Sequence, residues 1–151
     1  MFRAKSPATW VPLSLLLTQL GTQAAGGQQV EVTPAIEEAL VEQAVEEFYI
    51  KSSRTRDFDL IRAVCLPEAV LMSVRSDGSL SVTTLDRWSH RFDPANPPFT
   101  QLQSSIVKID REGTAAQVKI LFVVDGERRV TDFLHMLKVD GRWRIAGIID
   151  Y

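Results

Sequence analysis

Tyr49 and Asp132 are the residues of this sequence best suited to act as hydrogen-bonding or acid–base groups in a cavity. Tyr49 ends an apolar stripe with helical spacing, and Asp132 interrupts an apolar strand-like segment. A phenol and a carboxylate that face one cavity could bind the polar edge of a small ligand. The alternative is that Tyr49 is a core residue and that Asp132 forms a cross-strand ion pair with Lys119.

Other site chemistries lack the residues that they need. The single cysteine, Cys65, excludes an intramolecular disulfide, and its neighbours Val64 and Leu66 predict that it packs as a small buried apolar side chain. His90 and His135 fall on different predicted elements without other ligands at suitable spacing, so no metal site is expected. No glycine-rich phosphate loop or nucleophile elbow is present, and no cofactor is expected.

A long helix is predicted to carry Tyr49. Thr33 can cap it, Pro34 suits its first position, and Glu37 lies where the helix dipole favours an acid. Its apolar stripe consists of Ile36, Leu40, Val41, Ala44, Val45, Phe48 and Tyr49. A stripe of this width predicts that the helix packs across a sheet.

Two shorter helices are predicted after it. Asp57 can cap the first of them, which Pro67 ends. Thr83 and Asp86 resemble a capping box for the second, which carries Trp88. Residues 90–100 contain three prolines and are predicted to form a loop.

Asp125-Gly126 and Asp140-Gly141 predict two tight hairpins in the second half of the chain. Two-residue loops would pair Lys119 with Asp132, Ile120 with Thr131, Lys138 with Trp143, and Leu137 with Arg144. One face of the sheet would then carry Lys119, Leu121, Val123, Val130, Asp132, Leu134, Met136, Lys138, Trp143, Ile145 and Ile149. The other would carry Val118, Ile120, Phe122, Thr131, Phe133, His135, Leu137, Arg144, Ala146 and Ile148.

This order of elements predicts an α+β domain over residues 33–151, with three helices packed on one face of a curved antiparallel sheet. The helix stripe would cover the sheet face that carries Asp132 and Trp143. The resulting ligand pocket would be lined by Phe48, Tyr49, Met72, Trp88, Asp132, Leu134, Met136 and Trp143. The opposite face would expose Ile120, Phe122, Phe133, Leu137 and Ile148, which predicts a homodimer through the sheet.

Residues 1–24 have the pattern of a signal peptide. Arg3 and Lys5 precede an apolar run over residues 10–20, and small residues near Ala24 suit cleavage. The run is too short to span a bilayer. Residues 25–32 would form a flexible mature N-terminus, the protein would be secreted or periplasmic, and no stable membrane span would remain after cleavage.

The composition is that of one globular domain, with 45% hydrophobic and 24% charged residues. The net charge is only −2, so the chain has no basic excess for contacts with nucleic-acid phosphates. Nucleic acid is therefore not an expected partner.

Four motifs together resemble a known superfamily: Phe48-Tyr49, Asp57-Phe58-Asp59, Pro67-Glu68-Ala69 and the segment TDFLHMLKVDGRWRI over residues 131–145. They are similar to the nuclear transport factor 2-like superfamily, and in particular to its putative lumazine-binding branch. The resemblance implies a cystatin-like cone of helices on a curved sheet, often dimeric, with a pocket between them. It implies no single activity, because this superfamily includes both enzymes and binding modules.

The ketosteroid isomerases of that superfamily give the sharpest comparison with an enzyme. They use a tyrosine late in the first helix, a carboxylate base on the first hairpin and a protonated acid on a late strand. Tyr49 and Asp132 are similar to the first and the last, but the base position falls near Met72 to Val74, where Ser73 cannot act as a base. The leading hypothesis is therefore a non-catalytic module that binds a small apolar or aromatic ligand, or a dimeric accessory module. The alternatives are an isomerase-like or dehydratase-like enzyme and a purely structural interaction domain.

Overall fold

The computed structural model describes residues 33–92, 99 and 101–151. The helical elements are α1 (Pro34–Ala44), η2 (Val45–Ile50), α2 (Lys51–Thr55), α3 (Phe58–Val64), α4 (Leu85–Ser89) and η3 (His90–Phe92). The strands are β1 (Cys65–Val74), β2 (Leu80–Thr84), β3 (Leu102–Glu112), β4 (Ala115–Val124), β5 (Arg128–Val139) and β6 (Arg142–Asp150). The predicted signal peptide and the predicted flexible N-terminus lie outside the described residues.

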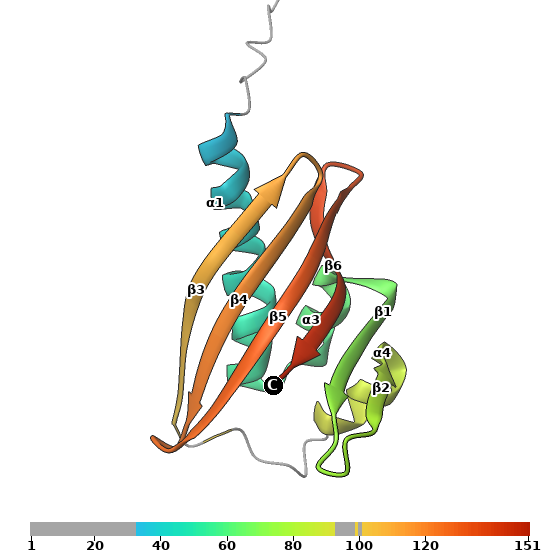
Figure 1. Cartoon of the computed structure of the whole chain (residues 1–151). Coiled ribbons are helices and arrows are strands. Elements are labelled where there is room, and N and C mark those ends of the chain that lie inside the picture. Colours follow the sequence, from blue (N-terminus) through green and yellow to red (C-terminus); the bar gives the residue numbers. More distant parts are fainter. Residues whose placement is uncertain (1–32, 93–98, 100) are drawn as a thin grey trace, which may run out of the picture. The chain divides into compact units, whose positions relative to one another are not determined.

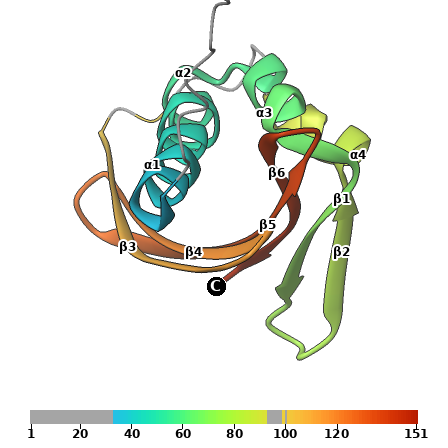
Figure 2. The same ribbon diagram turned by 90° about the horizontal axis from the view of Figure 1, so that it is seen from above.

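The six strands form one curved sheet in the order β2-β1-β6-β5-β4-β3 (Figure 1). The long helical segment made of α1, η2 and α2 lies in the hollow of the sheet, with α3 beside it over β6 (Figure 2). The prediction of helices on one face of a curved sheet is confirmed. The sheet is not wholly antiparallel, however, because β1 runs parallel to β6. No hairpin joins these two strands, so no turn fixes their relative direction.

The helices begin close to where the capping residues predict. The Thr33 hydroxyl accepts a hydrogen bond from the Ile36 amide at 3.4 Å, and the Asp57 carboxylate accepts one from the Asp59 amide at 2.9 Å. The cap of α4 is Thr84, one residue later than the capping-box pattern indicated. These caps satisfy amides that have no partner within the helix.

The register between β4 and β5 differs by one residue from the prediction. The Asp125-Gly126 turn closes as expected, with the Glu127 amide donating to the Val124 carbonyl at 3.3 Å. Pairing then begins with Val124 opposite Arg128, so the loop has three residues and Glu127 is the extra one before β5. A one-residue shift turns every side chain to the other face relative to its partner strand.

As a result, Asp132 lies opposite Ile120, and the predicted pair of Asp132 with Lys119 is wrong. Lys119 lies opposite Phe133 instead, and its ammonium group is 5.5 Å from the centre of that ring. No cation on β4 therefore compensates the Asp132 carboxylate.

The register between β5 and β6 is as predicted near the hairpin, where Lys138 pairs with Trp143. It shifts further along, because Met136 pairs with Ile145 whereas His135 pairs with Gly147, so Ala146 is an extra residue. Bulges of this kind bend a strand and change which face its following side chains occupy.

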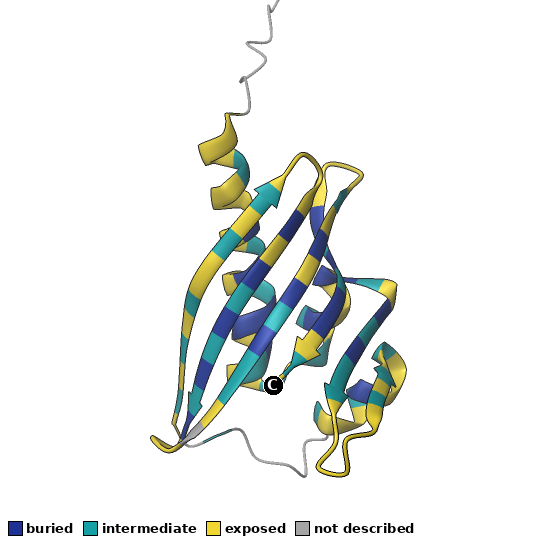
Figure 3. Ribbon diagram, viewed as in Figure 1, coloured by how far each residue is buried: buried dark blue, intermediate teal, exposed yellow. Residues whose placement is uncertain are grey.

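The two extra residues exchange several side chains between the predicted faces. Ile120, Phe122 and Ile148 were predicted on the outer face but are buried under the helices. Ile149 was predicted beside Trp143 but lies on the outer face, 39% exposed. The alternation of buried and exposed residues along β4 and β5 follows this corrected register (Figure 3).

Ile148 and Ile149 provide a direct test of the bulge in β6. Replacing the fully buried Ile148 with alanine should lower the free energy of unfolding by about 2–5 kcal/mol. The same change at the exposed Ile149 should lower it by at most about 1 kcal/mol. Urea unfolding of the two variants measures both values, and a larger loss at Ile149 would contradict the register described here.

Candidate functional site

Tyr49 and Asp132 meet in the interior, although 83 residues separate them in the sequence. The Tyr49 hydroxyl donates a hydrogen bond to the Asp132 carboxylate, with 2.7 Å between the oxygens. Tyr49 is 2% exposed and Asp132 is 7% exposed. In the part of the chain that the structure describes, Asp132 is the only buried residue with an ionisable carboxyl group.

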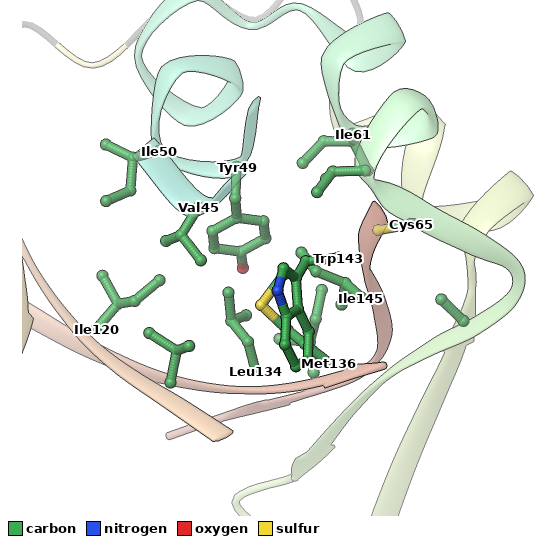
Figure 4. Close-up of a cluster of buried hydrophobic side chains, with 14 of the residues drawn as sticks. Val45, Tyr49, Ile50, Ile61, Cys65, Ile120, Leu134, Met136, Trp143 and Ile145 are labelled. Carbon is green, nitrogen blue, oxygen red and sulfur yellow. The ribbon is translucent and has the colours of Figure 1, made fainter. Parts of the chain in front are cut away.

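A wide helical turn positions the tyrosine. Val45–Ile50 is π-helical, and the Lys51 amide accordingly donates to the Glu46 carbonyl five residues earlier. The hydroxyls of Ser52 and Ser53 donate to the Tyr49 carbonyl at 2.6 and 3.2 Å. Tyr49 then points from the helix toward the strands, where its ring lies above Leu134 (Figure 4). Turns of this type are frequent at functional sites.

The sheet positions the aspartate between an apolar neighbour and an acidic one. Asp132 lies opposite Ile120 on β4 and opposite Asp150 on β6. Burial is the main cause that raises the pKa of Asp132 to about 6; the hydrogen bond from Tyr49 opposes this rise and the charge of Asp150 adds to it. Burial, followed by the charge of Asp132, raises the pKa of Tyr49 well above its ordinary value. The pair therefore consists of a phenol that keeps its proton and a carboxyl group that titrates near neutrality.

The pair lies at a cavity of about 270 Å³ between the helices and the sheet. Most of its lining side chains are aromatic or aliphatic, and several elements add polar groups. Its lining residues are Tyr49, Ser53, Arg56, Leu71, Trp88, Arg91, Phe92, Phe99, Leu102, Phe122, Val124, Val130, Asp132 and Asp150. A cavity of this size is suited to a small ligand rather than to a drug-sized one.

Aromatic rings from two other elements lie beside the tyrosine. The centre of the Tyr49 ring is 6.2 Å from that of Trp88 on α4 and 6.3 Å from that of Phe122 on β4. Trp88 in turn contacts Phe92 edge-on, with 5.7 Å between ring centres. Such rings can stack against a flat ligand while the phenol and carboxylate bind its polar edge.

A second hollow, of about 350 Å³, lies elsewhere between the first helix and the β5–β6 hairpin. Phe48 and Trp143 are among its lining residues. The Trp143 indole N–H donates to Glu37 at 3.0 Å, and Glu37 also forms an ion pair with Lys138. The hydrogen bond from Lys138 lowers the pKa of Glu37. These contacts link the first turn of α1 to strands β5 and β6 near their hairpin.

The structure thus distributes the eight predicted pocket residues over several places. Tyr49, Trp88 and Asp132 line the first cavity together. Phe48 and Trp143 line the second hollow, and Leu134 and Met136 are fully buried in the core. Met72 is half-buried on β1, between Val82 and Ile149, and lines neither space.

Asp150 and Arg56 also line the first cavity and were not predicted from the sequence. The bulge at Ala146 places Asp150 opposite Asp132, and only a correct register of β6 would have indicated it. Arg56 ends α2 with left-handed backbone angles, φ 59° and ψ 32°. Glycine is the usual residue at such a position, so the sequence contained no signal for this conformation.

The described residues contain neither a group of potential metal ligands nor a membrane-spanning helix. Over residues 33–92, 99 and 101–151, no three histidine, cysteine or acidic side chains are grouped to hold a metal ion. Within the same ranges, no helix is both long enough and apolar enough to cross a membrane.

The curved sheet and its covering helices place the protein in the nuclear transport factor 2-like class of α+β folds. Residues 36–147 match the family described as "Putative lumazine-binding", so the chain belongs to that family. No curated protein matches the chain.

Solved structures support the same fold. A nuclear transport factor 2-like protein of unknown function from Shewanella baltica superimposes with a TM-score of 0.72 at 24% identity, covering 79% of this chain and 95% of that one. One from Silicibacter pomeroyi gives 0.68 at 21% identity, covering 79% and 98%. A ketosteroid isomerase-like protein from Erwinia carotovora atroseptica gives 0.56 at 15% identity, covering 76% and 94%. At these identities the similarity concerns the fold alone.

The buried charge of Asp132 should make the domain less stable above neutrality. The pKa of this group in the folded protein, about 6, is higher than its ordinary value, so the contribution to stability is greatest at acidic pH and is lost as the pH rises through 6. Asp132→Asn removes the charge and keeps an oxygen that can accept from Tyr49. The difference in free energy of unfolding, variant minus wild type, should therefore increase by about 2–3 kcal/mol from pH 4 to pH 8.

Urea unfolding at several pH values measures this difference. Asp110→Asn is a suitable control, because Asp110 is exposed and forms only a surface ion pair with Lys108. A pH-independent difference between Asp132→Asn and the wild type would show that Asp132 does not titrate in this range.

Proposed function

We propose that the protein binds a small, flat heterocyclic ligand in the cavity beside Tyr49 and Asp132. The observation that carries this proposal is the buried hydrogen bond between these two residues, at a cavity otherwise lined largely by aromatic and aliphatic side chains. A buried carboxylate without a compensating cation is unfavourable for stability, so its presence in such a cavity favours a functional role.

The polar pair suggests which groups the ligand presents. At neutral pH the Asp132 carboxylate is largely ionised and can accept N–H groups of a ligand with its remaining lone pairs. The Tyr49 hydroxyl uses its proton toward Asp132, so its oxygen can accept a further hydrogen bond. A heterocycle with ring N–H groups, such as the lumazine in the family description, meets both requirements.

A second candidate function is proton transfer, and the pKa of Asp132 is the observation that favours it. A carboxylate with a pKa of about 6, held in a cavity by a phenol, could act as a general base near neutral pH. Prolonged incubation distinguishes the two functions. A bound heterocycle recovered unchanged supports binding, whereas Asp132-dependent conversion or hydrogen exchange supports an enzyme.

We also propose export, on the basis of the leader pattern in residues 1–24. The mature protein would begin near residue 25 and would be secreted or periplasmic. Intact-mass measurement of the protein from its native source tests this proposal, and a chain that still begins at Met1 would contradict it.

Binding of lumazine should depend on the Tyr49 hydroxyl. Tyr49→Phe keeps the ring but removes one neutral hydrogen bond, so it should weaken binding about fivefold. Tyr151→Phe is the matched control, because Tyr151 is 91% exposed and should leave the affinity unchanged. Titration of both variants by ligand fluorescence or calorimetry measures the effect. Equal affinities for wild type and Tyr49→Phe would contradict the proposed site.

A homodimer through the outer face of the sheet is a further proposal. After the corrected register, Leu137 and Ile149 are exposed there at 41% and 39%, and the Phe133 ring is half-buried beside them. Phe133→Glu should place a charge in such an interface and produce monomers in light scattering at micromolar concentration. A wild-type protein that is already monomeric would contradict this proposal.

A further inference from the structure

Arg56 holds its guanidinium group at the cavity in a fixed position. Its backbone is left-handed and its amide donates to the Ser52 carbonyl at 2.8 Å, which ends α2. One terminal nitrogen, Nη1, donates to the Arg91 carbonyl at 3.0 Å. The guanidinium carbon lies 4.6 Å from the centre of the Phe99 ring. These contacts orient the group before any ligand binds.

The same side chain has a buried donor without an acceptor. The Nε–H of Arg56 is inaccessible to solvent and finds no hydrogen-bond partner among the described residues. Buried donors of this kind are rare and call for a missing partner, such as a ligand or a water molecule. Because Arg56 lines the cavity, a bound ligand could provide that acceptor.

The unpartnered Nε–H of Arg56 does not by itself indicate a ligand. Arg144 also has a buried Nε without an acceptor, but it lines the second hollow and donates to the Cys65 carbonyl. Arg142 lines that hollow as well, so a pair of arginines does not distinguish the two spaces. Arg56 differs because its cavity also contains the buried hydrogen bond between Tyr49 and Asp132, with Arg91 as a second cation in the lining. Two guanidinium groups at one small cavity favour an anionic group of the ligand.

The charges of the cavity are separated by element. Arg56 and Arg91 come from the helical side, at the end of α2 and in η3, whereas Asp132 and Asp150 come from β5 and β6. Over the described residues, neither arginine forms an ion pair with either aspartate. Such an arrangement complements a ligand that has hydrogen-bond donors at one edge and a negative charge at another.

We propose that the ligand is a flat heterocyclic carboxylic acid whose carboxylate binds Arg56, with Arg91 adding charge. This inference rests on the proposed function, because Tyr49 and Asp132 would bind the ring N–H edge. A carboxylate is favoured over a phosphate because it is planar, matches the guanidinium fork and occupies less of a cavity of about 270 Å³. The two ends together would fix the orientation of the ring against Trp88.

Two pterins that differ in one substituent test the inference. We expect 6-carboxypterin to bind the wild-type protein about tenfold more tightly than 6-methylpterin, because a charge-assisted hydrogen bond is stronger than a neutral contact. Arg56→Gln should abolish that preference, so that the loss of affinity for 6-carboxypterin is about tenfold larger than any loss for 6-methylpterin. Titrations followed by pterin fluorescence give all the affinities.

Arg54→Gln is the matched control, because Arg54 lies on the same helix, donates to Ser104 and does not line the cavity. This variant should keep the tenfold preference. Equal affinities of the two pterins for the wild type would overturn the inference, and this comparison does not depend on the folding of any variant. An equal loss for both pterins in Arg56→Gln would also overturn it, since Arg56 would then have only a structural role.

The outcome for 6-methylpterin separates the inference from the proposed function. Suppose that 6-methylpterin binds, that Tyr49→Phe weakens this binding, and that the wild type shows no preference for 6-carboxypterin. The heterocycle site is then retained and the role of Arg56 is rejected. If lumazine binds and neither pterin does, the heterocycle site is retained and the inference is wrong; if none of the three binds, both proposals are wrong.

Discussion

The hydrogen bond between Tyr49 and Asp132 is the constraint on which the rest of the site depends. A carboxylate at 7% exposure is disfavoured in the interior, and among the described residues Tyr49 is the side chain that donates a hydrogen bond to it. The bond requires that the first helix and the fifth strand approach closely. The π-helical turn contains Tyr49, and its hydroxyl meets Asp132 on β5. The core around the pair is apolar, so the cavity gains two polar groups at one defined place.

Two inserted residues decide which side chains belong to this site. Glu127 shifts β5 by one residue against β4, which places Asp132 opposite Ile120 and removes it from Lys119. With a lysine opposite, the carboxylate would remain ionised and its pKa would not rise. Ala146 shifts β6 and brings Asp150 opposite Asp132. The acidic character of the sheet side of the cavity is therefore a product of one extra loop residue and one bulge, and bulges are common next to functional sites.

The fold could be predicted from the sequence because its main signals are local. The caps at Thr33 and Asp57, the helical stripe, and the Asp140-Gly141 hairpin each depend on a few neighbouring residues. The proximity of Tyr49 and Asp132 could also be predicted, since the sequence analysis assigned both residues to one cavity. The extra loop residue was not predictable, because an Asp-Gly turn has the same sequence whether or not a third loop residue follows it. The bulge at Ala146 lies within the strands, away from the turn that sets the register. Phe48 and Trp143 line the second hollow rather than the cavity beside Tyr49, and the π-helical turn that contains Phe48 departs from the regular helical spacing used to place its side chain.

Arg56 illustrates why the polar groups of a cavity are the hardest part to infer. The segment from Lys51 to Arg56 breaks the apolar pattern, and by composition it is solvated surface. The left-handed backbone at Arg56 turns the chain so that the guanidinium stacks on Phe99 and lines the cavity. A non-glycine residue in this conformation is strained by roughly 1 kcal/mol or more, and such strain persists where the surrounding structure requires it. Glycine would adopt the same turn without strain but would leave the cavity without its cation on α2. The side chain, rather than the turn, is therefore what favours arginine at this position.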